Sequence, residues 1–450
     1  MKALLVVPSI CDFAAHDMWA APYGLMTIAS AFRSYGVEFD IFDFLGREYV
    51  SKEYGDGRRR YKRTIIDIPE VLKGKSIKRH FAIYGANLLD IDERIESIYG
   101  EYDIILITTT MTYWYYGYQI IYNKLKKRFK NARFVIGGVY PSLIEGHCRS
   151  LFPDALIITN ENLPLFDKFI SEVLNRDFFC FSRNFPDWQL PDVEGFSYRR
   201  YIPVLLTRGC PFRCTYCASG RLVTDIENKD PIRLADWVIE MAEKTGIRDI
   251  ALFDDAFLVN HRSLAVPFLK RLSKSKMGFR IHASNGLHPR FIDENMANIM
   301  RESNFTTIRL SLESSNEERL VSTGGKVRRD EYETALENLR KVGYRKSDLG
   351  TYLICGIPHQ TPEEVLGSIR YVDECGGVVY LAEFSPIPNT PLFDEALRIS
   401  RYDLNEPLWQ NNTLMSYWNP IFNEDILNNI KAEVIKRRKE PTTGFEPVTY

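Results

Sequence analysis

The chain has 450 residues, enough for two or three domains and a well-buried core. Its 58 lysines and arginines nearly balance 59 aspartates and glutamates, so no overall field favours nucleic acid or an anionic membrane. No apolar run reaches the about 18 residues of a membrane-spanning helix, and "MKALLVVPSICDF" lacks a cleavage site and is predicted to be a first strand. Eight cysteines without a secretory segment indicate a reducing, cytoplasmic location.

Apolar runs alternate with helical patterns over the first part of the chain. Runs such as "KALLVVP" and "YDIILITTT" are continuously apolar, as strands buried on both faces of a parallel sheet require. Amphipathic segments separate them, so we predict a doubly wound, Rossmann-like α/β domain over residues 1–170. Residues 45–100 form an insertion between its second and third strands. The basic loop "GDGRRRYKR" in that insertion is interpreted as a solvated turn, with a binding patch as the alternative.

The alternation restarts after a segment rich in Pro, Asp and Gly, residues 171–199, which is predicted to be a linker. Six strands alternate with helices over residues 200–395 and predict a partial (β/α)6 barrel, two repeats short of a closed eightfold barrel. The remainder, residues 396–450, is predicted to be a helical extension that ends in a frayed tail. The predicted helices lie near residues 231–245, 262–274, 293–303, 329–343 and 362–376.

The loop "RGCPFRCTYCAS" places Cys210, Cys214 and Cys217 close together after the first predicted barrel strand. Disulfides within so tight a loop are disfavoured, because bridging needs separated Cα atoms and aligned Cβ vectors. A structural zinc site wants four ligands, and the other cysteines are scattered, although a fourth ligand from elsewhere in the fold stays open. Three thiolates instead suit a cubane iron–sulfur cluster that keeps one iron open for a ligand.

The spacing C-x-x-x-C-x-x-C, with the aromatic Tyr216 before the last cysteine, resembles the signature of the radical S-adenosylmethionine (SAM) enzymes. The resemblance covers roughly residues 200–395. It implies a [4Fe–4S] cluster whose open iron is chelated by SAM, and reductive cleavage of SAM to a 5'-deoxyadenosyl radical. It also implies an external electron donor of the flavodoxin or ferredoxin type.

Later strand ends supply residues that match the cofactor contacts of this family. Asp254 and Asp255, in "LFDDAF", match the positions that hold the methionine amino group, with helix capping as the alternative for Asp255. Ser284 and Asn285 are candidates for hydrogen bonds to the ribose, and His288 is a candidate catalytic contact with the substrate. The remaining predicted cofactor contacts are Glu313 near the nucleoside and Gly356 and Ile357 at the adenine.

A Rossmann-like domain before the barrel resembles the cobalamin-binding radical SAM enzymes of the class B methyltransferase type. The resemblance implies a corrin over the strand ends, with its nucleotide tail between those strands. The lower-ligand pattern D-x-H-x-x-G is absent, because His16, His80 and His147 do not fit it, and "TNENLP" departs from the acidic glycine turn of the family. Cobalamin would therefore be held without histidine. The predicted contacts are Thr108, Thr109, Thr110, Gly137 and Gly138, together with Tyr113 and Trp114, whose rings either stack on the corrin or fill its place.

The leading hypothesis is a cobalamin-dependent methyl transfer to an unactivated carbon of a small-molecule or peptide substrate, without a nucleic-acid or membrane partner. A radical cyclase or rearrangement enzyme that does not bind cobalamin is the first alternative. A structural iron or zinc protein is the second. Methylthiolation is disfavoured, because the first domain lacks three extra cysteines and no RNA-binding module follows the barrel. No motif identifies the substrate.

Overall fold

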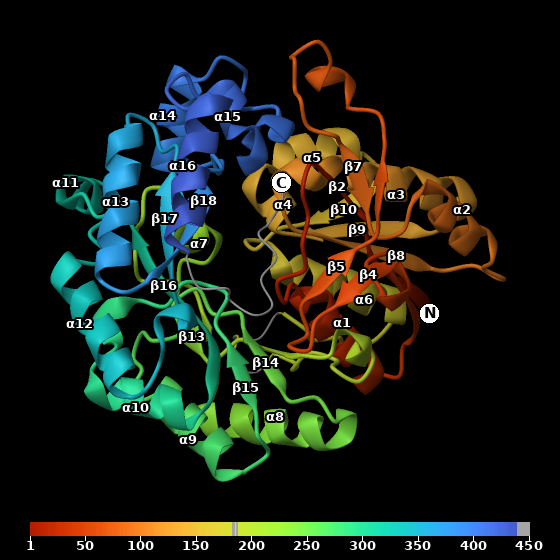
Figure 1. Cartoon of the computed structure of the whole chain (residues 1–450). Helices are drawn as coiled ribbons and strands as arrows, with labels where there is room; N and C mark the ends of the chain where they lie inside the picture. Colours follow the sequence, from red (N-terminus) through yellow and green to blue (C-terminus); the bar gives the residue numbers. More distant parts are fainter. Residues whose placement is uncertain (182–184, 186–187, 439–450) are drawn as a thin grey trace. The chain divides into compact units, whose positions relative to one another are not determined.

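The computed structural model describes residues 1–181, 185 and 188–438 (Figure 1). The chain divides into two compact units, residues 1–203 and residues 204–450, and each is described by itself. The four segment boundaries expected from the sequence stay a prediction. The tail expected to be frayed lies, from residue 439 onward, outside the described residues.

The first unit is built on a five-stranded parallel sheet with the strand order β10-β9-β8-β1-β3. In Figure 1, α1 and α6 cover one face, and α2, α3 and α5 cover the other. This doubly wound arrangement confirms the predicted Rossmann-like fold. The strands are β1 (Lys2–Val7), β3 (Glu38–Asp43), β8 (Ile104–Thr109), β9 (Arg133–Gly138) and β10 (Ala155–Ile158). The helices are α1 (Tyr23–Ser34), α2 (Leu88–Glu96), α3 (Tyr115–Arg128), α4 (Val139–Leu143), α5 (Glu145–Leu151) and α6 (Leu163–Leu174).

The centre of this sheet is apolar throughout, as a strand covered on both faces requires. The four residues from Ala3 to Val6 in β1 have no exposed surface, and Ile104 and Ile105 in β8 have none either. The ends of β8 and β9 then bring Thr109 and Gly138 side by side. The apolar strands therefore fix the position of the carboxyl edge at which the predicted cobalamin contacts lie.

The insertion folds into small antiparallel sheets beside the parallel one. One sheet has the order β2-β7-β6, and the other pairs β4 with β5. The interpretation of the basic loop as a solvated turn is wrong for Arg59, which is 2% exposed and pairs with Asp17 at 2.7 Å. A buried guanidinium needs a carboxylate partner, and the backbone bridge between Asp17 and Arg59 brings the two side chains together. The strands are β2 (Ile10–Asp12), β4 (Val50–Glu53), β5 (Arg59–Tyr61), β6 (Arg63–Ile65) and β7 (Ala82–Tyr84).

The second unit contains a six-stranded sheet with the order β11-β14-β15-β16-β17-β18. Figure 1 shows α8, α9, α10, α12 and α13 in an arc outside the strands β14 to β18, which confirms the partial barrel. The strands are β11 (Ile202–Val204), β14 (Asp249–Leu252), β15 (Arg280–His282), β16 (Phe305–Glu313), β17 (Leu349–Cys355) and β18 (Val378–Glu383). The helices are α7 (Ser219–Leu222), α8 (Pro231–Thr245), α9 (Ala265–Lys274), α10 (Glu294–Glu302), α11 (Glu317–Ser322), α12 (Arg329–Lys341) and α13 (Pro362–Glu374).

The barrel helices begin where the sequence provides side-chain caps. Asp230 accepts hydrogen bonds from the backbone of the first turn of α8, and Asp293 and Thr361 do the same for α10 and α13. Gly246 ends α8 in the left-handed conformation, with φ of 75°. Within the described ranges, no helix combines the length and the apolar character that a membrane span needs.

The first barrel strand differs from its prediction. A single strand was expected over residues 201–209, but β11 ends at Val204, and β12 (Thr207–Arg208) pairs antiparallel with β13 (Glu227–Asn228). The cysteine loop therefore leaves from a short ribbon rather than from the barrel strand itself.

The C-terminal segment packs back on the barrel through α14 (Pro391–Ile399), α15 (Met415–Trp418) and α16 (Glu424–Arg437). Met415 lies against Gly356, just after β17, and the Asn419 side chain donates a hydrogen bond to the Gly356 carbonyl at 2.9 Å. Both residues are fully buried. This extension therefore covers one strand end of the barrel.

Candidate active site

A cavity of about 360 Å³ lies at the carboxyl ends of the barrel strands, within the second unit. All three loop cysteines line it, together with residues that follow β14, β15 and α11 and residues near the ends of β16, β17 and β18. Carboxyl ends of parallel strands are the usual location of active sites in such folds. The lining includes Cys210, Cys214, Tyr216, Cys217, Asp255, Ser284, Asn285, His288, Ser311, Glu313, Lys326, Tyr352, Ile354 and Ala382.

The cysteine loop is held by hydrogen bonds to several other segments. The Arg213 guanidinium donates to the Cys210 carbonyl at 3.1 Å, and the Thr215 amide donates to the Thr323 carbonyl at 3.2 Å. The Thr215 carbonyl in turn accepts from the Leu392 amide at 3.1 Å. The Ser219 amide lies 3.4 Å from the Cys217 sulfur, in the geometry of an N–H···S hydrogen bond. The loop is thereby fixed before any metal binds.

The three thiols suit a cluster better than a single ion. Burial raises the pKa of Cys210 to about 11 and also raises the pKa of Cys214, so both need a metal to become thiolates at neutral pH. Among the residues that the structure describes, no three His, Cys, Asp or Glu side chains converge closely enough to hold one metal ion. A cubane needs a wider arrangement, because each thiolate binds a different iron. The donor set therefore fits an iron–sulfur cluster.

The two neighbouring aspartates lie in different environments. Asp254 is 2% exposed, accepts from the Thr207 amide at 2.7 Å and the Leu206 amide at 3.2 Å, and is not among the cavity lining. Burial raises the pKa of Asp254 to about 7, against the effect of these amides. Asp254 therefore anchors the ribbon that leads into the cysteine loop, and its predicted contact with a cofactor stays untested.

Asp255 is the aspartate that faces the cavity. Its side chain accepts a hydrogen bond from Ser219, and burial raises its pKa. The capping alternative for Asp255 is wrong, because the next helix begins at Ala265 and its cap position is Leu264. Asp255 is thus free to meet a cationic group of a ligand.

Ser284 and Asn285 line the cavity after β15. The Asn285 amide donates to the Phe253 carbonyl at 3.3 Å and the Asp254 carbonyl at 3.2 Å, which ties together the loops that follow β14 and β15. The Ser284 carbonyl accepts from the Tyr352 hydroxyl at 2.8 Å. Their predicted contact with a ribose is compatible with these positions and stays a prediction.

His288 also lines the cavity and stacks on Phe212 of the cysteine loop, with ring centroids 4.2 Å apart and an interplanar angle of 17°. Its Nδ1 atom is buried and has no hydrogen-bond partner within the described part of the chain. Burial, together with the charges of Lys326 and Arg290, lowers the pKa of His288 to about 2, so the imidazole is neutral. His288 braces the loop and keeps a hydrogen-bonding atom available.

Glu313 lies at the end of β16, where the strand register shifts after Ser311. Its φ of +70° is unusual for a residue with a side chain. Lys326 pairs with it at 3.2 Å, and both side chains are mostly buried, at 13% and 14% exposure. Sequence reasoning missed Lys326, because "TGGKV" matches no motif and only the fold places it beside the cysteines.

The predicted adenine contacts Gly356 and Ile357 do not line the cavity. Gly356 is covered by Met415, its amide donates to Gln360 at 2.8 Å, and Ile357 is 1% exposed. Ile354, which precedes them on β17, and its neighbour Ala382 on β18 are apolar lining residues instead. The strand pattern could have identified Ile354, because it lies two positions after Tyr352, which also lines the cavity, and residues two apart share a face of a strand.

The predicted cobalamin contacts lie at the carboxyl edge of the first unit. The Thr109 hydroxyl donates to the Gly137 carbonyl at 3.0 Å, and a Cβ atom on Gly138, whose φ is +123°, would collide with the Thr109 carbonyl. Gly138 is therefore required by the packing of β8 against β9. Thr108 lies partly exposed beside Gly137, and Thr110 is exposed.

The two aromatic residues of the following loop are turned into the protein. Tyr113 is 8% exposed, and the Trp114 indole donates to the Asp12 carboxylate. The large exposed side chains at this edge are Met111 and Val139, at 45% and 37%. Because the two rings point inward, the surface at this edge is formed by small and apolar side chains.

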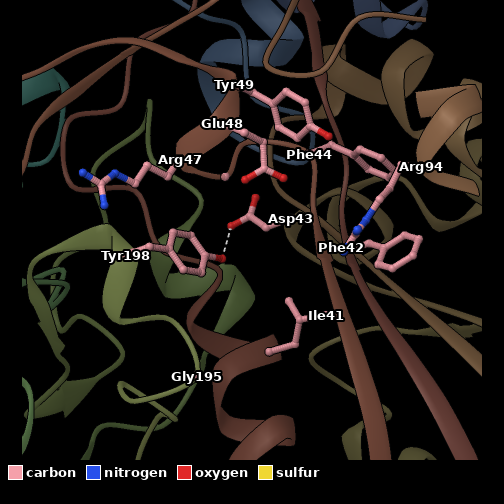
Figure 2. Close-up of a pocket in the computed structure, with 11 residues that line it drawn as sticks. Ile41, Phe42, Asp43, Phe44, Arg47, Glu48, Tyr49, Arg94, Gly195 and Tyr198 are labelled. Atoms are coloured by element: carbon pink, nitrogen blue, oxygen red, sulfur yellow. Dashed lines mark hydrogen bonds between the residues drawn. The ribbon is translucent and has the colours of Figure 1, made fainter. Parts of the chain in front are cut away.

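A second cavity, of about 280 Å³, lies at the end of the edge strand β3. Figure 2 shows Tyr198 and Asp43 pointing toward one another, and the hydroxyl donates to the carboxylate at 2.5 Å. The Leu45 amide and the buried Arg199 also donate to Asp43. None of the predicted cobalamin contacts lines this cavity.

Three free cysteines thus line one cavity at the carboxyl ends of a six-stranded partial barrel. Residues 204–372 match the family model described as the Radical SAM superfamily. This segment thus carries a radical SAM domain, and enzymes with this domain use a [4Fe–4S] cluster and SAM.

Curated relatives match about half of the chain or less. An uncharacterized methyltransferase of Pyrococcus horikoshii is 25% identical over 198 residues, which are 43% of this chain and 41% of that protein. The anaerobic magnesium-protoporphyrin IX monomethyl ester cyclase of Rubrivivax gelatinosus is 20% identical over 215 residues, 47% of this chain and 38% of that one. The chain thus spans about two fifths of the length of these relatives.

Solved structures share the fold over nearly the whole chain. The radical SAM methyltransferase TsrM from Kitasatospora setae has a TM-score of 0.67 and 14% identity, with 98% of this chain and 89% of that chain covered. The cobalamin-dependent radical enzyme OxsB has a TM-score of 0.58 and 13% identity, with 97% and 56% covered. At such identities the likeness establishes the fold: a Rossmann-like domain followed by a radical SAM barrel.

Proposed function

We propose that the protein is a cobalamin-dependent radical SAM methyltransferase that acts on an unactivated carbon of a small-molecule or peptide substrate. The carrying observation is the joint lining of one cavity by Cys210, Cys214 and Cys217 beside Asp255 and Glu313. Likeness in fold to TsrM, whose solved form contains cobalamin and a [4Fe–4S] cluster, supports the methyl-transfer part.

The lining residues divide into groups that would hold different parts of SAM. The three cysteines would bind the cluster, and the carboxylates of Asp255 and Glu313 would accept from an ammonium group. Lys326 is the one cation among the described lining residues and would pair with a carboxylate. Ser284, Asn285 and Tyr216 would contact the nucleoside, while Ile354 and Ala382 form an apolar wall.

When bound, the cluster and SAM supply a 5'-deoxyadenosyl radical, and methylcobalamin supplies a methyl group. The chain itself must orient the substrate and keep water and other hydrogen donors out. His288 suits the first task, because its neutral ring lines the cavity. Tyr352, which lines the cavity and donates to the Ser284 carbonyl, would serve the second by covering part of the bound substrate.

At the carboxyl edge of the first unit, Thr108, Thr109, Thr110, Gly137 and Gly138 would lie under the corrin. Support comes from the small side chains and from the exposed Met111 and Val139 beside them. Tyr113 and Trp114 would support the edge from below rather than stack on the ring. We also propose a cytoplasmic location and a flavodoxin- or ferredoxin-type electron donor.

The first experiment is anaerobic purification, reconstitution of the cluster, addition of hydroxocobalamin and measurement of retained metals after gel filtration. About four irons and one cobalt per chain are expected, as for one cubane and one corrin. Iron without cobalt would favour the cobalamin-free cyclase or rearrangement enzyme. Zinc in place of iron, or no cleavage of SAM by the reduced protein, would favour the structural metal protein.

A labelled methyl group then distinguishes methyl transfer from cyclisation. Label from SAM methyl is expected in the product when substrate candidates are supplied. Cyclisation would release 5'-deoxyadenosine without label in the product, an outcome to consider because several curated relatives are named cyclases. Cys355→Ala is the matched control for the cluster cysteines, since Cys355 is buried in β17 and does not line the cavity.

A further inference from the structure

Lys326 lines the same cavity as the three cysteines, in a segment that packs on the cysteine loop. We propose that its ammonium group raises the reduction potential of the iron–sulfur cluster and so makes the cluster easier to reduce. The inference rests on the proposed function, because it requires a cluster on the three cysteines. It concerns how readily the site accepts its electron, which is a property of the protein before any substrate binds.

The segment that carries Lys326 is joined directly to the cysteine loop. The Thr323 carbonyl accepts a hydrogen bond at 3.2 Å from the amide of Thr215, the residue that follows Cys214. Gly324 has a φ of +119°, and a Cβ atom there would lie 3.1 Å from the Cys214 Cα atom. Two successive residues of the segment thus contact the backbone that presents a cluster ligand, and they fix where Lys326 begins.

The segment is fixed from its other side as well. The Gly325 carbonyl accepts a hydrogen bond from the Arg290 guanidinium at 3.1 Å, and the same guanidinium lies 5.6 Å from the ring centroid of Phe212 in the cysteine loop. Lys326 then extends into the cavity that the cysteines line. The backbone that carries Lys326 is therefore fixed, unlike that of a lysine on a flexible surface loop.

The ammonium of Lys326 is enclosed in the cavity that the three cysteines line. The Lys326 side chain is only 14% exposed, so little solvent screens its charge. Lys326 pairs with Glu313 at 3.2 Å, and each of the two charges acts on the cluster site with its own sign.

The sign of the effect follows from the charge of the cluster. One-electron reduction adds one negative charge to the cluster, the electron comes from the external donor, and no bond is formed or broken in this step. A fixed cation nearby stabilises the reduced form more than the oxidised form, and net charge is one of the factors that set the potential of iron–sulfur clusters. Removing the ammonium should make the potential more negative, and removing the carboxylate should make it less negative.

The test is an anaerobic redox titration of the reconstituted full chain without SAM, followed by electron paramagnetic resonance of the reduced cluster. Lys326→Met should shift the midpoint to a more negative value, and Lys326→Arg should restore it. Glu313→Gln should shift it in the opposite direction. The matched control is Lys341→Met, which removes a lysine of a surface ion pair with Glu337 on α12; it should leave the midpoint unchanged.

Iron content separates failure of this inference from failure of the proposed function. A wild-type chain that retains no cluster overturns the proposed function. A Lys326→Met chain that retains its iron and titrates like wild type overturns the inference alone. If Lys326→Met loses its iron through the unpaired Glu313, the double variant with Glu313→Gln removes both charges, and its midpoint should lie below that of the Glu313→Gln variant; equal midpoints of these two variants reject the inference.

Discussion

The carboxyl edges of the two parallel sheets use different kinds of residue. In the second unit, charged side chains are drawn into a cavity, and Lys326 and Glu313 are paired there with little exposure. At the edge of the first unit, the residues are small or apolar, and Met111 is almost half exposed. Charges held out of water act strongly on a small reacting group, whereas an uncharged, open edge suits contact with a broad ring.

The two edges also differ in what their glycines accomplish. Gly324 lets a second segment approach the cysteine loop, and Gly138 lets β9 approach β8. Both have positive φ; a Cβ atom on Gly138 would collide with the Thr109 carbonyl, and one on Gly324 would lie 3.1 Å from the Cys214 Cα atom. In the second unit the close approach places a charge beside a ligand, while in the first unit it only closes the sheet. Similar backbone geometry therefore serves chemistry at one edge and packing at the other.

The strongest way to break this comparison is to remove a cluster ligand. Cys214→Ala should abolish retention of the cluster and reduce cleavage of SAM by more than the about 10–100-fold that loss of an outer-shell partner causes. Iron analysis and the yield of 5'-deoxyadenosine measure it. Cobalt retention by the first unit should be unaffected, so loss of both metals would contradict the separate roles of the two edges.

A substitution at Gly324 tests the approach of the Lys326 segment to the loop. Gly324→Ala should displace Cys214, because an alanine at this positive φ costs about 1–3 kcal/mol and its Cβ atom would lie only 3.1 Å from the Cys214 Cα atom. The variant should retain less iron per chain than wild type and should unfold at a lower temperature. Gly325→Ala is the matched control, since its φ is +60° but no atom lies within 4 Å of the added Cβ. Equal effects of the two variants would reject the role assigned to the contact.

Two adjacent glycines sharpen the comparison at the other edge. Gly138→Ala should destabilise the chain by about 1–3 kcal/mol, through its collision with Thr109. Gly137→Ala should change unfolding little, because the nearest atom to the added Cβ is 3.6 Å away. Thermal unfolding measures both variants, with cobalt retention as the second readout. Cobalt lost in Gly137→Ala with normal stability would place the corrin directly over that residue.

The smallest expected effect concerns Asp254 and pH. Burial raises the folded-state pKa of Asp254 to about 7 from its usual 3.8, so the folded state binds more protons between these values. The contribution of Asp254 to stability is therefore fully present below pH 3.8, falls as pH rises and levels off above about 7. Asp254→Asn should flatten this fall in chemical denaturation series. An unchanged slope would show that another group causes it.

Periodicity and motif spacing predicted most of the fold and part of the site. The alternation of apolar runs and amphipathic helices identified both sheets, because a buried strand is recognisable from the apolar residues of its own segment. The cysteine loop identified the metal site, since three ligands lie within one short segment. Asp255, Ser284 and Asn285 followed from strand ends, and the structure brings all three to the cavity.

The parts that sequence reasoning missed depend on contacts between distant segments. Lys326 reaches the cavity only because Thr323 and Gly324 pack on the loop. Gly356 is withdrawn from it because Met415, about sixty positions later, covers the turn. Arg59 is buried rather than solvated because Asp17, more than forty positions earlier, pairs with it. No local pattern encodes such pairings, so they require the tertiary structure.

The cover formed by Met415 and Asn419 on Gly356 sets a lower limit on a minimal catalytic fragment. A chain shortened after α14 would uncover the end of β17, leave the Gly356 carbonyl without its donor and expose a buried apolar surface. Such a fragment would keep every cluster ligand yet be prone to aggregate. Any attempt to transplant this barrel behind a different N-terminal domain must therefore carry the chain at least through residue 419.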